Sequence, residues 1–110
     1  LRPALYGAYH QILYANDLNA ENDQSVNVVG QVCENSDIFA KDRMLSSKIA
    51  VDDFLVFLNT GAYGFCMSSQ YNSQPKAAEV LVNHGQAALI RERETVQDIF
   101  RGTHQPRFIS

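Results

Sequence analysis

Apolar residues in this chain recur mostly at every second position, a period typical of β-strands rather than helices. The segment 26–33 shows this alternation most clearly and ends at Cys33. Further strands are expected over residues 9–15, 54–58, 78–82 and 87–91, with a polar loop over 16–24. The sequence therefore predicts a mainly β domain.

Local signals refine this expectation. The run 54–58 is continuously apolar, which is typical of a strand buried on both faces. Residues 83–85 (Asn-His-Gly) indicate a tight hairpin turn. Thr95 and Asp98 have capping-box spacing, so we expect a short C-terminal helix over 96–101, ended by Gly102.

Length and charge exclude several classes of protein. A chain of 110 residues suits one domain, which we expect to span residues 1–110. Nine basic against twelve acidic residues give a net charge of −3 with no basic run, which argues against nucleic acid as a partner. No apolar run approaches the roughly 18 residues that span a bilayer.

Other features of composition concern context. Charged residues make up 19% of the chain, below the roughly 25% typical of soluble domains, as expected where another domain or subunit covers part of the surface. Two cysteines, Cys33 and Cys66, form neither a disulfide framework nor a zinc motif, which favours a reducing cytoplasm. The start at Leu1 indicates a piece of a longer protein.

Two stretches carry groups suited to binding and a third carries a reactive group. Arg2 and Tyr6 lie four apart, so a single helical turn would project both from one side to grip a carboxylate or phosphate. Gly61 and Gly64 frame Tyr63, which could lie against a ring or phosphate. An exposed arginine, core tyrosines and a plain turn would explain the same residues.

The reactive group is Cys33, which is followed at once by Glu34. Catalytic groups tend to lie in loops at strand ends. Repulsion by the neighbouring carboxylate disfavours a thiolate, which suits a thiol that donates a proton. A buried structural cysteine is the alternative, and it is the stronger interpretation for Cys66, which lies between Phe65 and Met67.

Together these stretches resemble the C-terminal domain of the diaminopimelate decarboxylase family, which belongs to the alanine-racemase-like, pyridoxal-phosphate-dependent decarboxylases of fold type III. Six motifs in the same order carry the resemblance: Arg2-Pro3-Ala4-Leu5-Tyr6, the strand ending in Cys33-Glu34, Gly61-Ala62-Tyr63-Gly64, Tyr71-Asn72, Ala78-Glu79-Val80-Leu81-Val82 and Arg91-Glu92-Arg93-Glu94.

The resemblance implies a two-domain enzyme, in which a β/α barrel holds pyridoxal 5'-phosphate on a lysine and a second domain forms a β-barrel or sandwich. This chain resembles the second domain only, so the fragment alone is expected to be inactive. The three lysines, Lys41, Lys48 and Lys76, match no cofactor lysine of the family. The implied reaction is decarboxylation of meso-diaminopimelate to L-lysine.

The resemblance also implies residue roles. Cys33 matches the proton donor, presented across a homodimer interface to the partner's barrel. Arg2, Tyr6 and Glu34 match residues that bind the far end of the substrate, with Glu34 meeting its distal ammonium. Tyr63 matches a tyrosine that touches both cofactor and substrate. No metal is implied.

This chain departs from the family pattern at three positions: Asn35-Ser36 replaces the usual Ser-Gly after the Cys-Glu pair, Gln11 replaces a frequent proline, and Gln74 replaces a basic residue. These changes leave the implied reaction type intact and bear on the precise substrate. Three alternatives to the implied function are open. The substrate could be carboxynorspermidine, ornithine or arginine, the protein could be a non-catalytic homologue, or the chain could be a free-standing β module.

Overall fold

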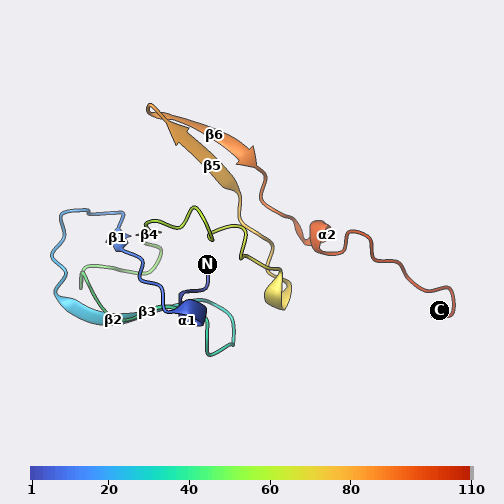
Figure 1. Ribbon diagram of the computed structural model, residues 1–110, viewed down its shortest axis with the longest axis horizontal. Coiled ribbons are helices and arrows are strands. Elements are labelled where there is room, and N and C mark those ends of the chain that lie inside the picture. Colours follow the sequence, from blue (N-terminus) through green and yellow to red (C-terminus); the bar gives the residue numbers. More distant parts are fainter. Residues whose placement is uncertain (110) are drawn as a thin grey trace. The chain divides into compact units, whose positions relative to one another are not determined.

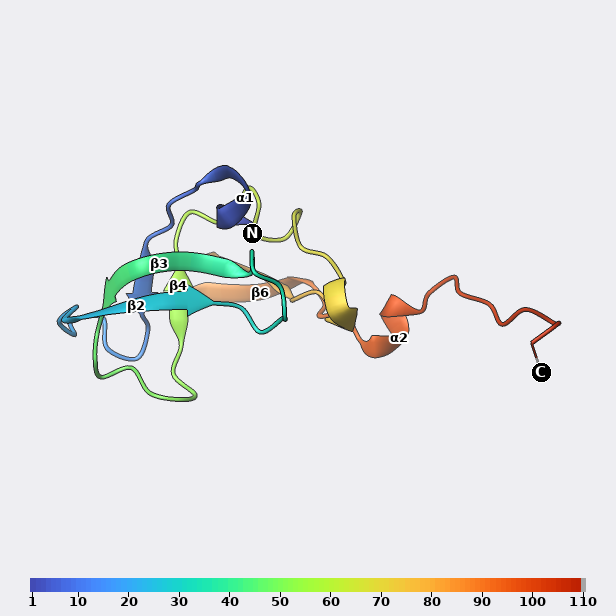
Figure 2. The same cartoon turned by 90° about the horizontal axis from the view of Figure 1, so that it is seen from below.

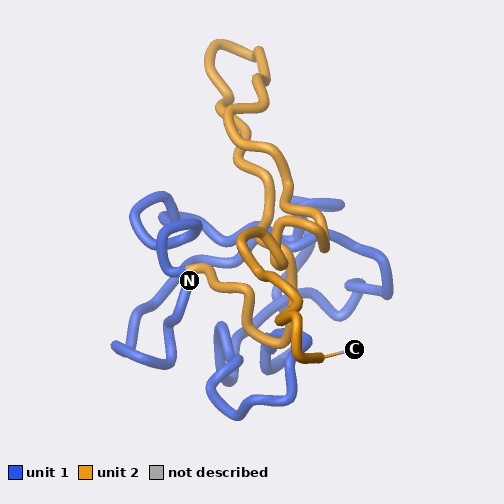
Figure 3. Tube along the Cα trace, turned by 90° about the vertical axis from the view of Figure 1, so that its right-hand side faces the viewer, with its two compact units in different colours: residues 1–67 blue, residues 68–110 orange. Residues whose placement is uncertain are grey.

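The computed structural model describes residues 1–109 and divides into two compact units, Leu1–Met67 and Ser68–Ser110 (Figure 3). The expectation of one domain over residues 1–110 stays a prediction. No helix in the described part of the chain is long and apolar enough to cross a bilayer, since both α-helices have four residues.

The first unit contains one helical turn and two antiparallel strand pairs (Figure 1). The elements in chain order are α1 (Pro3–Tyr6), β1 (Ile12–Tyr14), β2 (Gln24–Val29), β3 (Ile38–Leu45) and β4 (Leu55–Phe57). β1 pairs with β4, and β2 lies beside β3, as Figure 2 also shows. The mainly β prediction is confirmed.

The core of this unit is small and lies between the two strand pairs. Ile12, Ala40 and Leu45 are its buried apolar residues. Five partly buried side chains pack around them: Val26, Val28, Ile49, Leu55 and Phe57. β4 therefore buries one face only, because Val56 between the two inward residues is 43% exposed. The prediction that segment 54–58 is buried on both faces is wrong for this structure.

β3 was not predicted, and a β-bulge explains why its pattern is obscured. Ala40 and Leu45 both face the core although they are an odd number of residues apart, which an unbroken strand does not allow. Val26 pairs with Arg43 and Val28 with Ala40, so β3 contains one extra residue there. Asp42 adopts a φ of 47° at this point, which the Asn27 side chain supports by accepting its amide at 3.0 Å.

The second unit contains η1 (Tyr71–Ser73), β5 (Glu79–Asn83), β6 (Gln86–Arg91) and α2 (Val96–Ile99). β5 and β6 form the expected hairpin, with His84 (φ 46°) and Gly85 (φ 74°) at its two-residue turn. The predicted capping box is present, since the Asp98 carboxylate accepts the Thr95 amide at 2.8 Å. Every residue of β6 is exposed.

Candidate functional site

Strand pairing in the first unit brings the predicted site segments together. α1 precedes β1 and the turn 59–67 follows β4, and because β1 and β4 run antiparallel these two flanks meet at the same end of the pair. The Gln11 carbonyl accepts the Leu58 amide at 2.9 Å, and His10 Nδ1 lies 3.0 Å from the Leu58 carbonyl. The site therefore draws on segments far apart in sequence.

The predicted helical turn at the start of the chain is present. Pro3 occupies the first turn, where it has no amide to satisfy, and Gly7 ends the helix with a φ of 67°. The Arg2 amide donates a hydrogen bond to the Tyr6 hydroxyl oxygen at 3.4 Å. The Tyr6 and Tyr63 rings lie 6.0 Å apart between centroids at 52°, so these two predicted residues meet.

Gly64 holds the turn that carries Tyr63. Its amide donates to the Thr60 carbonyl at 2.6 Å, and a Cβ at this position would lie 2.6 Å from the same oxygen. A glycine is therefore required at residue 64 for close backbone approach, whereas a Cβ at Gly61 would meet nothing within 4 Å. Tyr63 itself is 54% exposed, which leaves its ring available for contact.

Cys33 lies in the loop 30–37 between β2 and β3, not at the end of a strand. The expected strand over 26–33 ends at Val29, because the Gly30 amide donates to the Asp37 carbonyl at 2.8 Å and closes the loop. Cys33 is exposed, and neither it nor Cys66 forms a disulfide within residues 1–109. The buried structural interpretation therefore fails for both cysteines in this structure.

A chain of hydrogen bonds links Arg2 to Glu34 through Ser36. Arg2 Nη2 donates to Ser36 Oγ at 3.4 Å, and the Ser36 hydroxyl donates in turn to the Glu34 carboxylate. The Ser36 amide donates to the other carboxylate oxygen at 3.0 Å. Ser36 thus places a guanidinium and a carboxylate one hydroxyl apart.

These contacts set the charge of Glu34. The hydrogen bond from the Ser36 hydroxyl and then that from its amide hold the pKa of Glu34 below its ordinary value; desolvation opposes them, and the charge of Arg2 adds the smallest lowering. The side chain is therefore an ionised acceptor at neutral pH. It can receive an ammonium while Arg2 receives a carboxylate.

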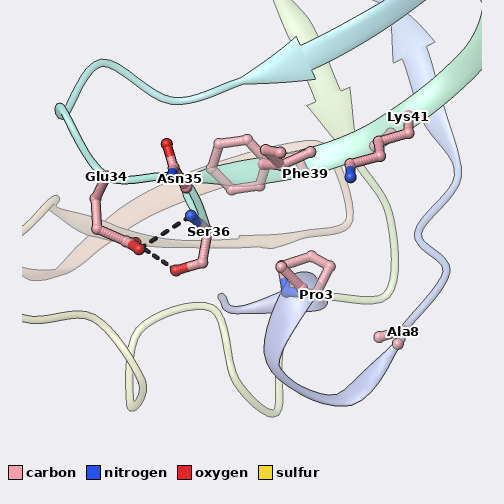
Figure 4. Close-up of a pocket in the computed structure, with 11 residues that line it drawn as sticks. Pro3, Ala8, Glu34, Asn35, Ser36, Phe39 and Lys41 are labelled. Atoms are coloured by element: carbon pink, nitrogen blue, oxygen red, sulfur yellow. Dashed lines mark hydrogen bonds between the residues drawn. The ribbon is translucent and has the colours of Figure 1, made fainter.

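Beside this chain of bonds the surface is hollowed, with a volume of about 520 Å³ between α1, the loop 30–37 and β3. Figure 4 shows Pro3, Ala8, Phe39 and Lys41 around it, with Glu34 and Ser36 joined at one side. Glu34 is the predicted site residue that lines this hollow; Arg2, Tyr6, Cys33 and Tyr63 are not among its lining residues.

Sequence reasoning assigned no role to two residues of the loop, Ser36 and Asp37. Ser36 bridges Arg2 and Glu34, and the Asp37 carboxylate accepts the Val32 amide at 3.1 Å. Gly30 could have indicated this arrangement, because a glycine next to a strand end often marks a close approach of another group. A Cβ there would lie 2.0 Å from the Asp37 oxygens.

Comparison with known proteins gives consistent results. Residues 1–61 match the family described as pyridoxal-dependent decarboxylase, C-terminal sheet domain. The chain is 51% identical over 106 residues to a diaminopimelate decarboxylase of Methanothermobacter thermautotrophicus, covering 96% of this chain and 24% of that protein. It is 43% identical over 109 residues to the Archaeoglobus fulgidus enzyme, covering 99% of this chain and 26% of that protein.

Solved structures agree with these relatives. A crystal structure of diaminopimelate decarboxylase from M. jannaschii, in complex with L-lysine, superposes with a TM-score of 0.87 at 37% identity, covering 99% of this chain and 24% of that one. The structure of the Helicobacter pylori enzyme, also complexed with L-lysine, superposes with a TM-score of 0.79 at 39% identity, covering 91% of this chain and 24% of that one. This chain spans about a quarter of the length of the proteins that it matches.

Proposed function

The chain belongs to the pyridoxal-dependent decarboxylases, as their C-terminal sheet domain, and we propose on this premise that the longer protein decarboxylates meso-diaminopimelate to L-lysine. The relatives named above are diaminopimelate decarboxylases, and two of them were solved with L-lysine bound, which would be the product of this reaction. Because this chain covers about a quarter of such proteins, it would supply part of the active site.

The observation that carries the proposal is the Arg2–Ser36–Glu34 chain of bonds. The distal end of diaminopimelate carries a carboxylate and an ammonium on one carbon. A guanidinium and an ionised carboxylate one hydroxyl apart offer each of these groups an opposite charge. Ornithine lacks the distal carboxylate, and arginine carries a guanidinium instead, so both would leave Arg2 without an anionic partner from the substrate.

Tyr6 and Tyr63 complete the binding surface in this proposal. Their tilted rings form an exposed aromatic pair next to Arg2, suited to covering the substrate's methylene chain. Tyr63 also fits one edge of a pyridoxal phosphate site, since its phenol is exposed on a turn held by Gly64. The cofactor lysine would lie outside this chain.

Cys33 would supply the proton that replaces carbon dioxide. Pyridoxal phosphate, when bound, would supply an electron sink for the electron pair left on the α carbon as carbon dioxide departs. After the C–C bond breaks, the Cys33 S–H bond would break and a C–H bond would form at the α carbon, and solvent would then return a proton to the thiolate. The exposed position of Cys33 suits presentation to a site on another chain, so we propose a homodimer with shared active sites.

The test uses the full-length protein with pyridoxal phosphate and meso-diaminopimelate, assayed for L-lysine and carbon dioxide. Ornithine, arginine and carboxynorspermidine serve as competing substrates. Turnover of diaminopimelate at a kcat/KM at least about 100-fold above the others is expected. Faster turnover of another substrate would replace the proposed one, and no turnover together with no cofactor absorbance would favour a non-catalytic homologue.

The role of Cys33 is tested by Cys33→Ala against Cys66→Ala, since both thiols are exposed. Removing a general acid typically costs about 10²- to 10⁴-fold in rate. We expect that loss in kcat for Cys33→Ala, with cofactor absorbance retained, and little change for Cys66→Ala. Equal kcat values for the two variants would refute the assignment.

A further inference from the structure

The loop that carries Cys33 is held by contacts that converge on Asp37. The Asp37 carboxylate accepts the Val32 amide at 3.1 Å, and the Asp37 amide donates to the Glu34 carbonyl at 3.0 Å. Its carbonyl accepts the Gly30 amide at 2.8 Å. Through its backbone and its side chain, this residue is bonded to both neighbours of Cys33.

Cys33 itself occupies the centre of a three-residue turn. The Glu34 amide donates to the Val32 carbonyl at 2.9 Å, which is a γ-turn across Cys33. With Val32 fixed on one side and Glu34 on the other, the direction of the Cα–Cβ bond of Cys33 is set by the backbone. A change that frees the Val32 amide would therefore change where the thiol points.

Gly30 gives independent evidence that the position of the carboxylate is specific. A Cβ on Gly30 would lie 2.0 Å from each Asp37 carboxylate oxygen, far inside van der Waals contact. The Asp37 carboxylate therefore occupies the space that any other residue at position 30 would fill. Two different substitutions, one at each residue, can remove the same contact.

We propose that Asp37 is a positioning residue that fixes the direction of the Cys33 side chain. It does so through the hydrogen bond from the Val32 amide to its carboxylate and through the packing of that carboxylate against Gly30. The inference rests on the proposed role of Cys33 as proton donor. It predicts that Asp37→Ala and Gly30→Ala lower kcat by the same route. A misplacement of about 1 Å can cost on the order of 100-fold, so we expect a loss of roughly 10- to 100-fold.

The chain offers a matched control at the opposite end of the same strand pair. Asp23 precedes β2, and its carboxylate accepts both the amide and the hydroxyl of Ser47 at 2.7 Å, just beyond β3. Asp23→Ala removes comparable hydrogen bonds between a carboxylate and the backbone, at the end of the β2–β3 pair that lies away from Cys33. It should leave kcat within about twofold of the wild type, while Asp37→Asn, which keeps an oxygen acceptor for Val32, should recover most of the turnover.

The decisive experiment is a double-mutant cycle in the full-length protein. Asp37→Ala is measured in the wild-type and Cys33→Ala backgrounds, with kcat, KM and cofactor absorbance for each. If Asp37 acts through Cys33, its substitution lowers kcat in the first background and has little further effect in the second. The same fold loss in both backgrounds would overturn the inference.

A second readout keeps this inference separate from the proposed reaction. Amide hydrogen exchange at Val32 should accelerate in Asp37→Ala and Gly30→Ala and stay near the wild-type rate in Asp37→Asn and Asp23→Ala. Unchanged exchange in Asp37→Ala would show that the Asp37 carboxylate does not hold the Val32 amide, and it would refute the inference even in an active enzyme. Wild-type protein that turns over no amino acid but shows the expected exchange pattern would refute the reaction and leave the loop mechanism standing.

Discussion

Replacing Gly64 with alanine should disable the turn that presents Tyr63. A Cβ on residue 64 would lie 2.6 Å from the Thr60 carbonyl oxygen, whereas real Cβ atoms keep at least 3.0 Å and reach ordinary contact at 3.4 Å. The backbone must therefore open by about 0.4 to 0.8 Å, the difference between these distances. The obstacle is a backbone atom, so no side-chain rotation relieves it.

The opening has two consequences of different size. Overpacking of this kind costs about 1–3 kcal/mol in the free energy of unfolding. Since Tyr63 immediately precedes Gly64, the same shift moves its ring relative to Tyr6, which lies 6.0 Å away. A displacement of up to about 1 Å in a substrate-positioning group can cost on the order of 100-fold, so we expect kcat/KM to fall roughly 10- to 100-fold.

Gly61→Ala is the matched control, because a Cβ there meets nothing within 4 Å and its φ is not positive. The assay compares kcat, KM and cofactor absorbance of the full-length variants, with thermal unfolding in parallel. The reasoning predicts a large loss for Gly64→Ala and a change within about twofold for Gly61→Ala. Two variants with the same kcat/KM would refute it.

Two further predictions concern stability. Leu45→Ala should lower the free energy of unfolding by about 2–5 kcal/mol, because Leu45 is 2% exposed in a core with few other buried residues. Val51→Ala, at a position that is 91% exposed, should lower it by less than about 0.5 kcal/mol. Amide hydrogen exchange of β2 and β3 measures both changes. The amide of Ala50 and the hydroxyl of Tyr14 hold the pKa of Asp53 below its ordinary value, so its contribution is present above the unfolded pKa and is lost as pH falls through the folded one. Thermal unfolding of Asp53→Asn should therefore depend less on pH in the acid range than that of the wild type, and an unchanged pH profile would contradict this.

The sequence predicted best those elements that depend on neighbouring residues. The β5–β6 hairpin, its His84-Gly85 turn and the capping box of α2 are local, and all three are present. The strands β1 and β4 also lie within the expected segments 9–15 and 54–58, although β1 is shorter than expected and their pairing was not predicted.

Contacts that the alternating pattern does not reveal account for the strand bounds that were wrong and for the strand that was missed. Alternation from Val26 continues past Val29, but the bond between Gly30 and Asp37 ends the strand there and turns residues 30–37 into a loop. In β3 the bulge at Asp42 reverses which positions face the core, so no constant period runs through it. The bulge depends on β2, where Asn27 is 15 residues away from Asp42, whereas Gly30 was a local signal for the loop that the alternating pattern obscured.

The candidate site shows the same division. The motifs around Arg2, Cys33 and Tyr63 could be recognised as stretches of unusual residues, and the helical turn that carries Tyr6 was expected. The bridge through Ser36 joins positions 34 residues apart. Its existence depends on the loop 30–37 folding back toward α1, which only the three-dimensional structure supplies.

The β5–β6 hairpin has a consequence for how the longer protein must be refolded in the laboratory. Its only charged residues, Glu79 and Arg91, pair with each other at its open end, and Val80, Leu81, Val82, Leu89 and Ile90 are each more than half exposed. Within residues 1–109 its two strands pair only with one another, so their outer edges keep backbone groups that a further strand could meet. During refolding, pairing of these edges with another segment of the same chain does not depend on protein concentration, whereas pairing with a second molecule becomes faster as the concentration rises, so dilute protein should aggregate less.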